Sequence, residues 1–187
     1  MIPRKLNIGC GKDKKEGYLN VDIIPDVKPD MVVPCLPERQ PFEDEQFDEV
    51  LAHGVSPYIK ITQLIPTLQE LCRIGKKVLI NFSPINGSAT KVFEIDHIPI
   101  TYSISDLRNL DYRKRKGDDW IARDYNLKIN KAYFTLHFEK YFPFNIIKKI
   151  VNKSEKTQDI YQKSFLMYIA PPQNIWLELE LAKRERK

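Results

Sequence analysis

The chain has 187 residues, the size of one domain, with a net charge of +5 and 42% hydrophobic residues. No apolar run approaches the roughly 18–20 residues that span a bilayer, and residues 1–5 do not resemble a signal peptide, so we expect a cytoplasmic protein with no membrane partner. The three cysteines are scattered without a CxxC pair, which argues against disulfides and against a structural metal site. The positive charge favours an acidic partner only weakly.

Short apolar runs alternate with polar turns over the first 82 residues. Between the last two of these runs, apolar residues spaced three and four apart predict an amphipathic helix over residues 61–74, capped by Gly75. Such an alternation predicts a parallel sheet with crossover connections. The expected strands are residues 5–8, 18–23, 31–33, 47–52 and 77–82.

The second half of the chain is less regular. Strict alternation of apolar and polar residues over 175–181 predicts a strand with one wet face, antiparallel and near a sheet edge. The aromatic residues between 133 and 144 are typical of a core. The other expected elements are a short helix at 104–110, a strand or hairpin at 127–141 and a helix at 155–169.

The N-terminal strand runs directly into a glycine-rich turn, reading LNIGCG over residues 6–11. About ten residues later the next apolar run ends in Asp22. This order is typical of the nucleotide-binding corner of a Rossmann-like fold: the glycines let backbone approach a ligand, and one carboxylate can accept from both hydroxyls of a ribose. A dinucleotide site would need a third glycine and an immediate helix, whereas residues 12–15 are KDKK, which argues against NAD.

These motifs resemble those of class I S-adenosylmethionine-dependent methyltransferases, especially small predicted members whose N-terminus reads LNLGCG…GYxNVD. Residues 41–50, PFEDEQFDEV, are similar to the LPFxDxSFDxI segment of that group, and residues 70–80 are similar to its ExxRVLKPGGxLxI. The resemblance implies an α/β three-layer Rossmann-like methyltransferase fold, with a mostly parallel sheet and an antiparallel last strand. It implies one domain over residues 1–187, with a cofactor-binding half at 1–82 and an acceptor-side half at 83–187.

The resemblance also implies S-adenosylmethionine as cofactor, and it assigns residues to the parts of that molecule. Asp22 would bind the ribose, the turn would admit the methionine tail, Cys35 and Leu36 would lie near adenine, and His53 would lie beside the methionine end. Phe42 and Asp44 belong to the loop that closes over adenine in the family, although Asp44 by itself is typical of a solvated turn. The expected cofactor-binding residues are Asn7, Gly9, Cys10, Gly11, Asp22, Ile23, Cys35, Leu36 and His53, and the expected acceptor-side residues are Tyr58 and His97.

Several alternatives stay open. His53 is either a lining residue, an acid/base or a packed histidine, and no catalytic residue is assigned because methyl displacement can run on positioning alone. Relatives carry Glu and His where this chain has Ser56 and Pro57, so an inactive cofactor-binding subunit is one alternative. A nucleic-acid-binding protein that uses the basic run at residues 113–116 is another. The acceptor is a small molecule or a nucleic acid, and a homodimer is one possible arrangement.

Overall fold

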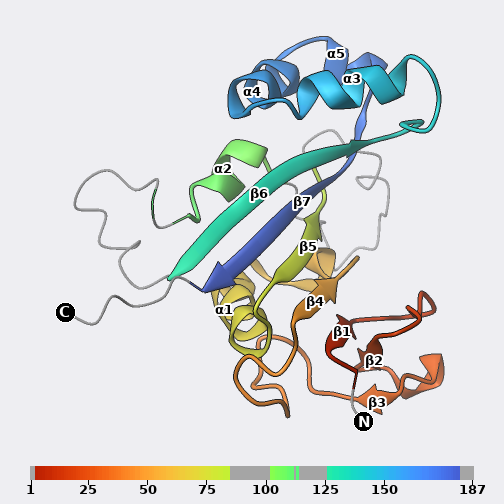
Figure 1. Cartoon of the computed structure of the whole chain (residues 1–187), viewed down its shortest axis with the longest axis vertical. Coiled ribbons are helices and arrows are strands. Elements are labelled where there is room, and N and C mark those ends of the chain that lie inside the picture. Colours follow the sequence, from red (N-terminus) through yellow and green to blue (C-terminus); the bar gives the residue numbers. More distant parts are fainter. Residues whose placement is uncertain (1–2, 85–101, 112, 114–125, 182–187) are drawn as a thin grey trace.

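The structure is a computed structural model that describes residues 3–84, 102–111, 113 and 126–181. Its centre is a seven-stranded sheet with the order β3-β2-β1-β4-β5-β7-β6 (Figure 1). The strands are β1 (Lys5–Ile8), β2 (Leu19–Asp22), β3 (Met31–Val32), β4 (Glu49–Ala52), β5 (Val78–Phe82), β6 (Leu127–Leu136) and β7 (Pro172–Leu181).

The strand pairing confirms the predicted mostly parallel sheet with an antiparallel last strand. The pairs among β1 to β5 are all parallel, and β7 runs antiparallel to both β5 and β6. The last strand of the chain is therefore antiparallel, as expected, but it is inserted beside the edge strand β6. Its alternating residues Ile175, Leu177 and Leu179 are fully buried, because they belong to the core cluster that also contains leucines of α1 and α2.

The helices begin and end close to the predicted positions in the first half and differ in the second. The predicted helix at 61–74 starts as a 3-10 turn, and the predicted helix at 155–169 is interrupted at Ser164. The predicted strand at 127–141 stops at Leu136, and the helix that follows was not predicted. The helices are α1 (Leu64–Ile74), α2 (Ile104–Arg108), α3 (Phe144–Val151), α4 (Glu155–Lys163) and α5 (Leu166–Ile169), with 3-10 turns η1 (Pro25–Val27), η2 (Ser56–Tyr58) and η3 (Ile61–Gln63).

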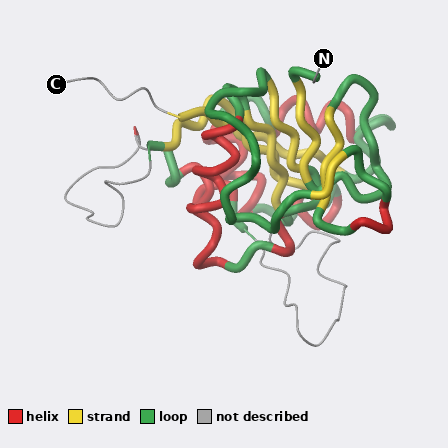
Figure 2. Tube along the Cα trace, turned by 90° about the horizontal axis from the view of Figure 1, so that it is seen from below, coloured by secondary structure: helices red, strands yellow, loops and turns green. Residues whose placement is uncertain are grey.

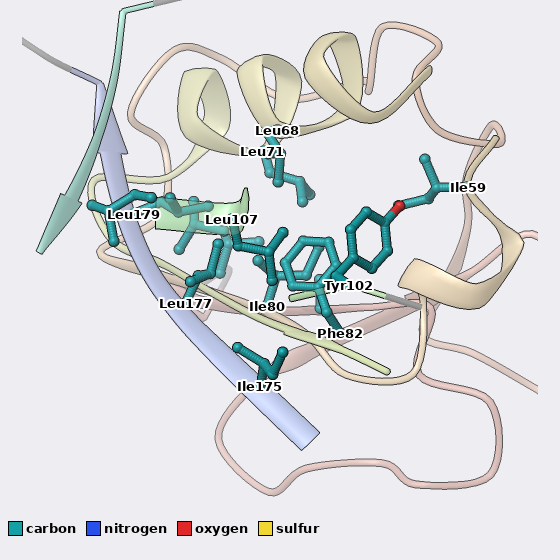
Figure 3. Close-up of a cluster of buried hydrophobic side chains, with 14 of the residues drawn as sticks. Ile59, Leu68, Leu71, Ile80, Phe82, Tyr102, Leu107, Ile175, Leu177 and Leu179 are labelled. Carbon is teal, nitrogen blue, oxygen red and sulfur yellow. The ribbon is translucent and has the colours of Figure 1, made fainter. Parts of the chain in front are cut away.

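The main core lies between the sheet and the two helices α1 and α2. Leu68 and Leu71 of α1 point towards the buried side chains of β5 and β7, as Figure 3 shows. Leu107 of α2 lies in the same cluster, and all three leucines are at most 1% exposed. Burying these side chains is the largest favourable contribution to folding.

The opposite face of the sheet is built differently. Within the described ranges, α1 and α2 lie behind the sheet in Figure 1, and no helix crosses the front of β4, β5 and β7; Figure 2 shows the layers from below. Trp176, Glu178 and Glu180 of β7 point to this front face and are half-buried. Ion pairs join neighbouring strands there, Lys77 with Glu178 at 3.2 Å and Lys128 with Glu180. Because the charges are paired across strands, this face can meet water without a second helical layer.

The connection from β6 to β7 rises above the end of the sheet and contains α3, α4 and α5 (Figure 1). Side chains of this connection satisfy the outer backbone of the edge strand. Asn152 accepts from the Phe134 amide at 2.8 Å and donates to its carbonyl at 2.8 Å, and Gln158 donates to the carbonyl of Ala132. Among the described residues, no helix is long and apolar enough to cross a membrane.

Candidate functional site

The carboxyl ends of three neighbouring strands define the candidate site. Strand β1 lies between β2 and β4, and all three run in the same direction. The chain leaves β1 towards β2 on one side and later returns to β4 on the other, so the strand order reverses at this point, where open α/β sheets bind ligands. Gly9 follows β1, Asp22 ends β2 and His53 follows β4, so the topology brings these three predicted residues to one edge.

The turn after β1 depends on two glycines with different surroundings. Gly9 and Gly11 have φ values of +67° and +50°, a region that side chains disfavour. A Cβ on Gly9 would lie 2.6 Å from Cγ2 of Val55, so this glycine permits close packing on the segment after β4. A Cβ on Gly11 would have no heavy atom within 4 Å, so Gly11 borders open space.

Asp22 is held against this turn by backbone donors. Its carboxylate accepts from the Gly11 amide at 2.7 Å and from the Ile24 amide at 2.9 Å, and the residue is 6% exposed. Each carboxylate oxygen therefore has one backbone donor and capacity for another. Two vicinal hydroxyls are a ligand of that kind, because each can donate to one oxygen.

Asn7 shapes the turn from below. Its amide donates both hydrogens, to the carbonyl of Asp13 at 3.0 Å and to Oδ1 of Asn20 at 3.0 Å. Asn20 in turn accepts from the Lys15 amide, and its own backbone N–H donates to the carboxylate of Asp30. Hydrogen bonds from Asn20 hold the pKa of Asp30 below its usual range. The Asn7 amide, which was expected to bind the cofactor, therefore orders the turn in this structure. Asn20 and Asp30 were not predicted as site residues, because their roles depend on pairing across strands.

Cys10 is buried inside the turn at 4% exposure, and its backbone N–H donates to the carbonyl of Val21. Burial, followed by the nearby Asp22 carboxylate, raises the pKa of the Cys10 thiol. Cys10 therefore stays protonated and contributes through its backbone and volume.

The segment expected to lie near adenine is a loop after β3 that is fastened from behind. Cys35 is exposed and Leu36 is half-buried. The side-chain amide of Gln40 donates to the carbonyl of Pro34 at 3.1 Å and to that of Glu38 at 2.9 Å. The backbone N–H of Gln40 donates to the carboxylate of Glu70 in α1. These bonds fix the shape of the loop from 34 to 40.

Arg73 of α1 also holds this loop in place. Its guanidinium pairs with Glu70 at 2.6 Å and with Asp44 at 2.7 Å, and it donates to the carbonyl of Phe42. Phe42 itself is buried edge-to-face against Phe47. Phe42 is thus a core residue and Asp44 an ion-pair partner. Beside Asp22, the apolar side chains of Ile23 and Ile24 are each 52% exposed.

His53 stands at the far side of the turn in contact with two unpredicted partners. Its Nδ1 is 3.7 Å from a carboxylate oxygen of Asp13, and its ring is stacked on Trp176 with centroids 5.4 Å apart. Hydrogen bonding from Lys15, with a smaller contribution from His53, holds the pKa of Asp13 below its usual range. The Gly54 amide donates to Asn81, which bridges to Asn174 of β7 at 2.8 Å. Strand β7 therefore braces this side of the site.

The acceptor-side predictions are only partly covered by the structure. Tyr58 ends η2 and is 78% exposed, while His97 and residues 114–116 lie outside the described residues. Arg113, the described member of the basic run, pairs with the buried Asp111 at 2.6 Å and donates to the carbonyl of Ile129. Within the described ranges, no group of three or more His, Cys, Asp or Glu could hold a metal ion.

Comparison with solved structures supports this reading of the fold. One match is a chain from a Haloferax volcanii complex of the methyltransferase activator Trm112, with a TM-score of 0.56 at 13% identity, covering 95% of this chain and 82% of the other. A second is an S-adenosylmethionine-dependent methyltransferase from Archaeoglobus fulgidus, with a TM-score of 0.53 at 15% identity, covering 95% and 86%. A third is the methyltransferase domain of bacterial CtHen1, with a TM-score of 0.50 at 11% identity, covering 96% and 90%.

The chain has a methyltransferase fold. No family model and no curated protein sequence matches it. The likeness therefore concerns the fold, and the activity has to be argued from the site.

Proposed function

We propose that this chain binds S-adenosylmethionine at the carboxyl ends of β1, β2 and β4 and transfers its methyl group to an acceptor. The observation that carries the proposal is the Asp22 carboxylate, fixed by the Gly11 and Ile24 amides beside the open space at Gly11. Asp22 would accept from the ribose hydroxyls, and the turn at Gly9–Gly11 would take the amino-acid tail. Ile23 and the Cys35–Leu36 segment would flank the adenine.

The same residues favour this ligand over a dinucleotide. Residues 9–18 form a turn with no helix, so no helix N-terminus is available there for a pyrophosphate. The turn instead presents backbone groups beside the Asp22 carboxylate, which match a zwitterionic tail and a sugar.

When bound, S-adenosylmethionine supplies a methyl group already activated on a sulfonium. The residues of this chain then need to position the cofactor and the acceptor and to exclude water, more than to activate either reactant. Asp22 and the turn would set the position of the cofactor, while His53 and Trp176 would form a wall beside the reacting end. The acceptor would approach from the side of the β6–β7 connection, which lies at the same sheet edge, in keeping with an acceptor-side half at residues 83–187.

Calorimetric titration with S-adenosylmethionine, S-adenosylhomocysteine and NAD tests the binding step. We expect both adenosyl ligands to bind and NAD to give no heat of binding. Incubation with methyl-labelled S-adenosylmethionine and fractionated pools of small molecules and RNA then tests transfer, with label expected in one fraction. NAD binding in place of the adenosyl ligands would contradict the proposal.

One observation favours a second candidate function, that of a catalytically inactive subunit that binds the cofactor. Ser56 and Pro57 stand where the family that the sequence resembles carries Glu and His, and here they begin η2, with Ser56 buried. Tight binding of both adenosyl ligands without label transfer to any fraction would favour a cofactor-binding subunit.

A further inference from the structure

The β6–β7 connection, residues 137–171, exposes an unusual amount of apolar surface. Of the sixteen large apolar side chains that are exposed in the described residues, nine belong to this connection. Three of them, Phe138, Tyr141 and Phe142, precede α3 and are 63–78% exposed. Exposed apolar surface gathered in one part of a protein marks a place of contact with another apolar body. The other six are Ile146, Ile150, Ile160, Phe165, Leu166 and Ile169.

Helix α3 shows why this surface is not simply a badly covered core. Successive residues of a helix are about 100° apart, so Ile147 and Val151 share one side and Ile146 and Ile150 share the neighbouring side. Val151 is 4% exposed and Ile147 packs on the core, whereas Ile146 and Ile150 are 46% and 58% exposed. The apolar arc of α3 is therefore wider than the part that the protein covers.

Lysines are frequent in this connection, and its acids are already engaged in ion pairs. Residues 137–171 contain six lysines and three acids, which leaves a net charge of +3. Glu139 pairs with Lys148, and Glu155 and Asp159 both pair with Arg108 of α2. The remaining lysines have no ion pair within the described part of the chain; they are Lys140, Lys149, Lys153, Lys156 and Lys163.

Contrary to the expectation of no membrane partner, we propose that the surface of this connection around α3 docks on an anionic lipid bilayer. Exposed aromatic and aliphatic side chains would enter the boundary between head groups and acyl chains, and the free lysines would meet the lipid phosphates. The absence of a spanning helix in the described residues is compatible with this, because such a segment lies on the membrane rather than across it.

Charge and apolar surface together distinguish three candidate partners for this surface: a second copy of this chain, a nucleic acid and an anionic bilayer. In a second copy of this chain, an isologous contact through this face would bring the same lysines together, which costs free energy. A nucleic acid would match the lysines but would leave the isoleucines without an apolar partner. An anionic bilayer offers both partners at once.

Vesicle sedimentation tests the proposal. The full chain is mixed with phosphatidylcholine vesicles and with vesicles in which part of the lipid is phosphatidylserine. We expect binding to the anionic vesicles that weakens with rising salt, and little binding to the neutral ones. Replacing Lys149, Lys153 and Lys156 by Gln should lower the partition coefficient by about fivefold per lysine.

A matched pair of variants tests the apolar part. Phe142→Ser/Ile150→Ser removes side chains that are 78% and 58% exposed, and the control Tyr58→Ser/Ile61→Ser removes side chains that are 78% and 60% exposed elsewhere. We expect the first pair to lose at least about tenfold in anionic-vesicle binding and the control to bind like the wild type, with both variants unfolding at the same temperature as the wild type.

Three outcomes would overturn the proposal: no binding to anionic vesicles, equal losses in both double variants, or a concentration-dependent dimer that only Phe142→Ser/Ile150→Ser abolishes. None of these depends on methyl transfer, since ligand binding at the carboxyl ends of β1, β2 and β4 is measured separately.

Discussion

Gly9 and Gly11 lie two residues apart in one turn, and both have positive φ, yet they meet different surroundings. Gly9 lies against Val55, whereas Gly11 faces empty space next to the Asp22 carboxylate. A side chain at Gly9 would therefore disturb packing, and a side chain at Gly11 would occupy the place we assign to the ligand.

Alanine at each position should separate these two roles. Gly9→Ala should lower the free energy of unfolding by about 3 kcal/mol, from the left-handed backbone and the clash with Val55 together. Gly11→Ala should cost only about 1 kcal/mol and weaken S-adenosylhomocysteine binding by at least about tenfold. Chemical denaturation and calorimetry measure the two quantities. Equal effects of both variants on stability and on affinity would contradict the assignment.

At the scale of elements, the loop after β3 keeps its shape through bonds to α1. Burial alone would raise the pKa of Glu70, but the Arg73 guanidinium and the Gln40 amide outweigh it and hold that pKa below its usual range. A carboxyl with a lowered pKa stabilises the fold above its unfolded-state pKa and loses that contribution as the pH falls through its folded-state pKa.

The pH dependence of unfolding checks this link. At pH 7, Glu70→Gln should be about 2 kcal/mol less stable than the wild type. Below about pH 4.5 the difference should shrink, because protonation then weakens the same bonds in the wild type. Denaturant unfolding at several pH values gives the comparison, in which the other acids of the chain contribute equally to both proteins. A difference that stays constant down to pH 3 would argue against the ionised Glu70.

The edge strand β6 depends on an amide side chain in place of a neighbouring strand. Asn152 meets both backbone groups of Phe134 at 2.8 Å. Asn152→Ala should lower stability by about 2 kcal/mol and speed hydrogen exchange at the Phe134 amide by at least about tenfold. Exchange measured by NMR reports on this amide directly, and an unchanged rate would show that other groups protect the edge.

At the scale of the whole molecule, the sequence predicted the sheet and its strand directions because each strand carries its own local pattern. It could not predict the surroundings of His53, since Trp176 and Asn174 arrive on a strand more than 100 residues later. The sequence did not predict helix α3, because Pro143 precedes it and the neighbouring run of aromatic residues is typical of a core. The predicted contacts of Gly9, Gly11 and Asp22 with a cofactor stay predictions, although the three residues meet at one edge as expected.

The two faces of the sheet are covered differently. In the described residues, α1 and α2 cover one face, while the front of β4, β5 and β7 relies on cross-strand ion pairs such as Lys77–Glu178. The connection between β1 and β2 is a short turn without a helix, so the candidate site is built mostly from backbone turns and strand ends. Its precision therefore depends on the hydrogen bonds that Asn7 donates and that Asn20 and Asp22 accept, rather than on helix packing.

The most direct test of the account is calorimetric titration of S-adenosylhomocysteine into the wild type, Asp22→Asn and Asp26→Asn. Asp26 is an exposed acid of η1, four residues after Asp22, so its replacement is matched in charge and chemistry. We predict that Asp22→Asn weakens binding by about 10- to 100-fold while Asp26→Asn binds like the wild type, with both variants still folded by thermal unfolding. Equal dissociation constants for all three proteins would contradict the claim that Asp22 holds the ribose.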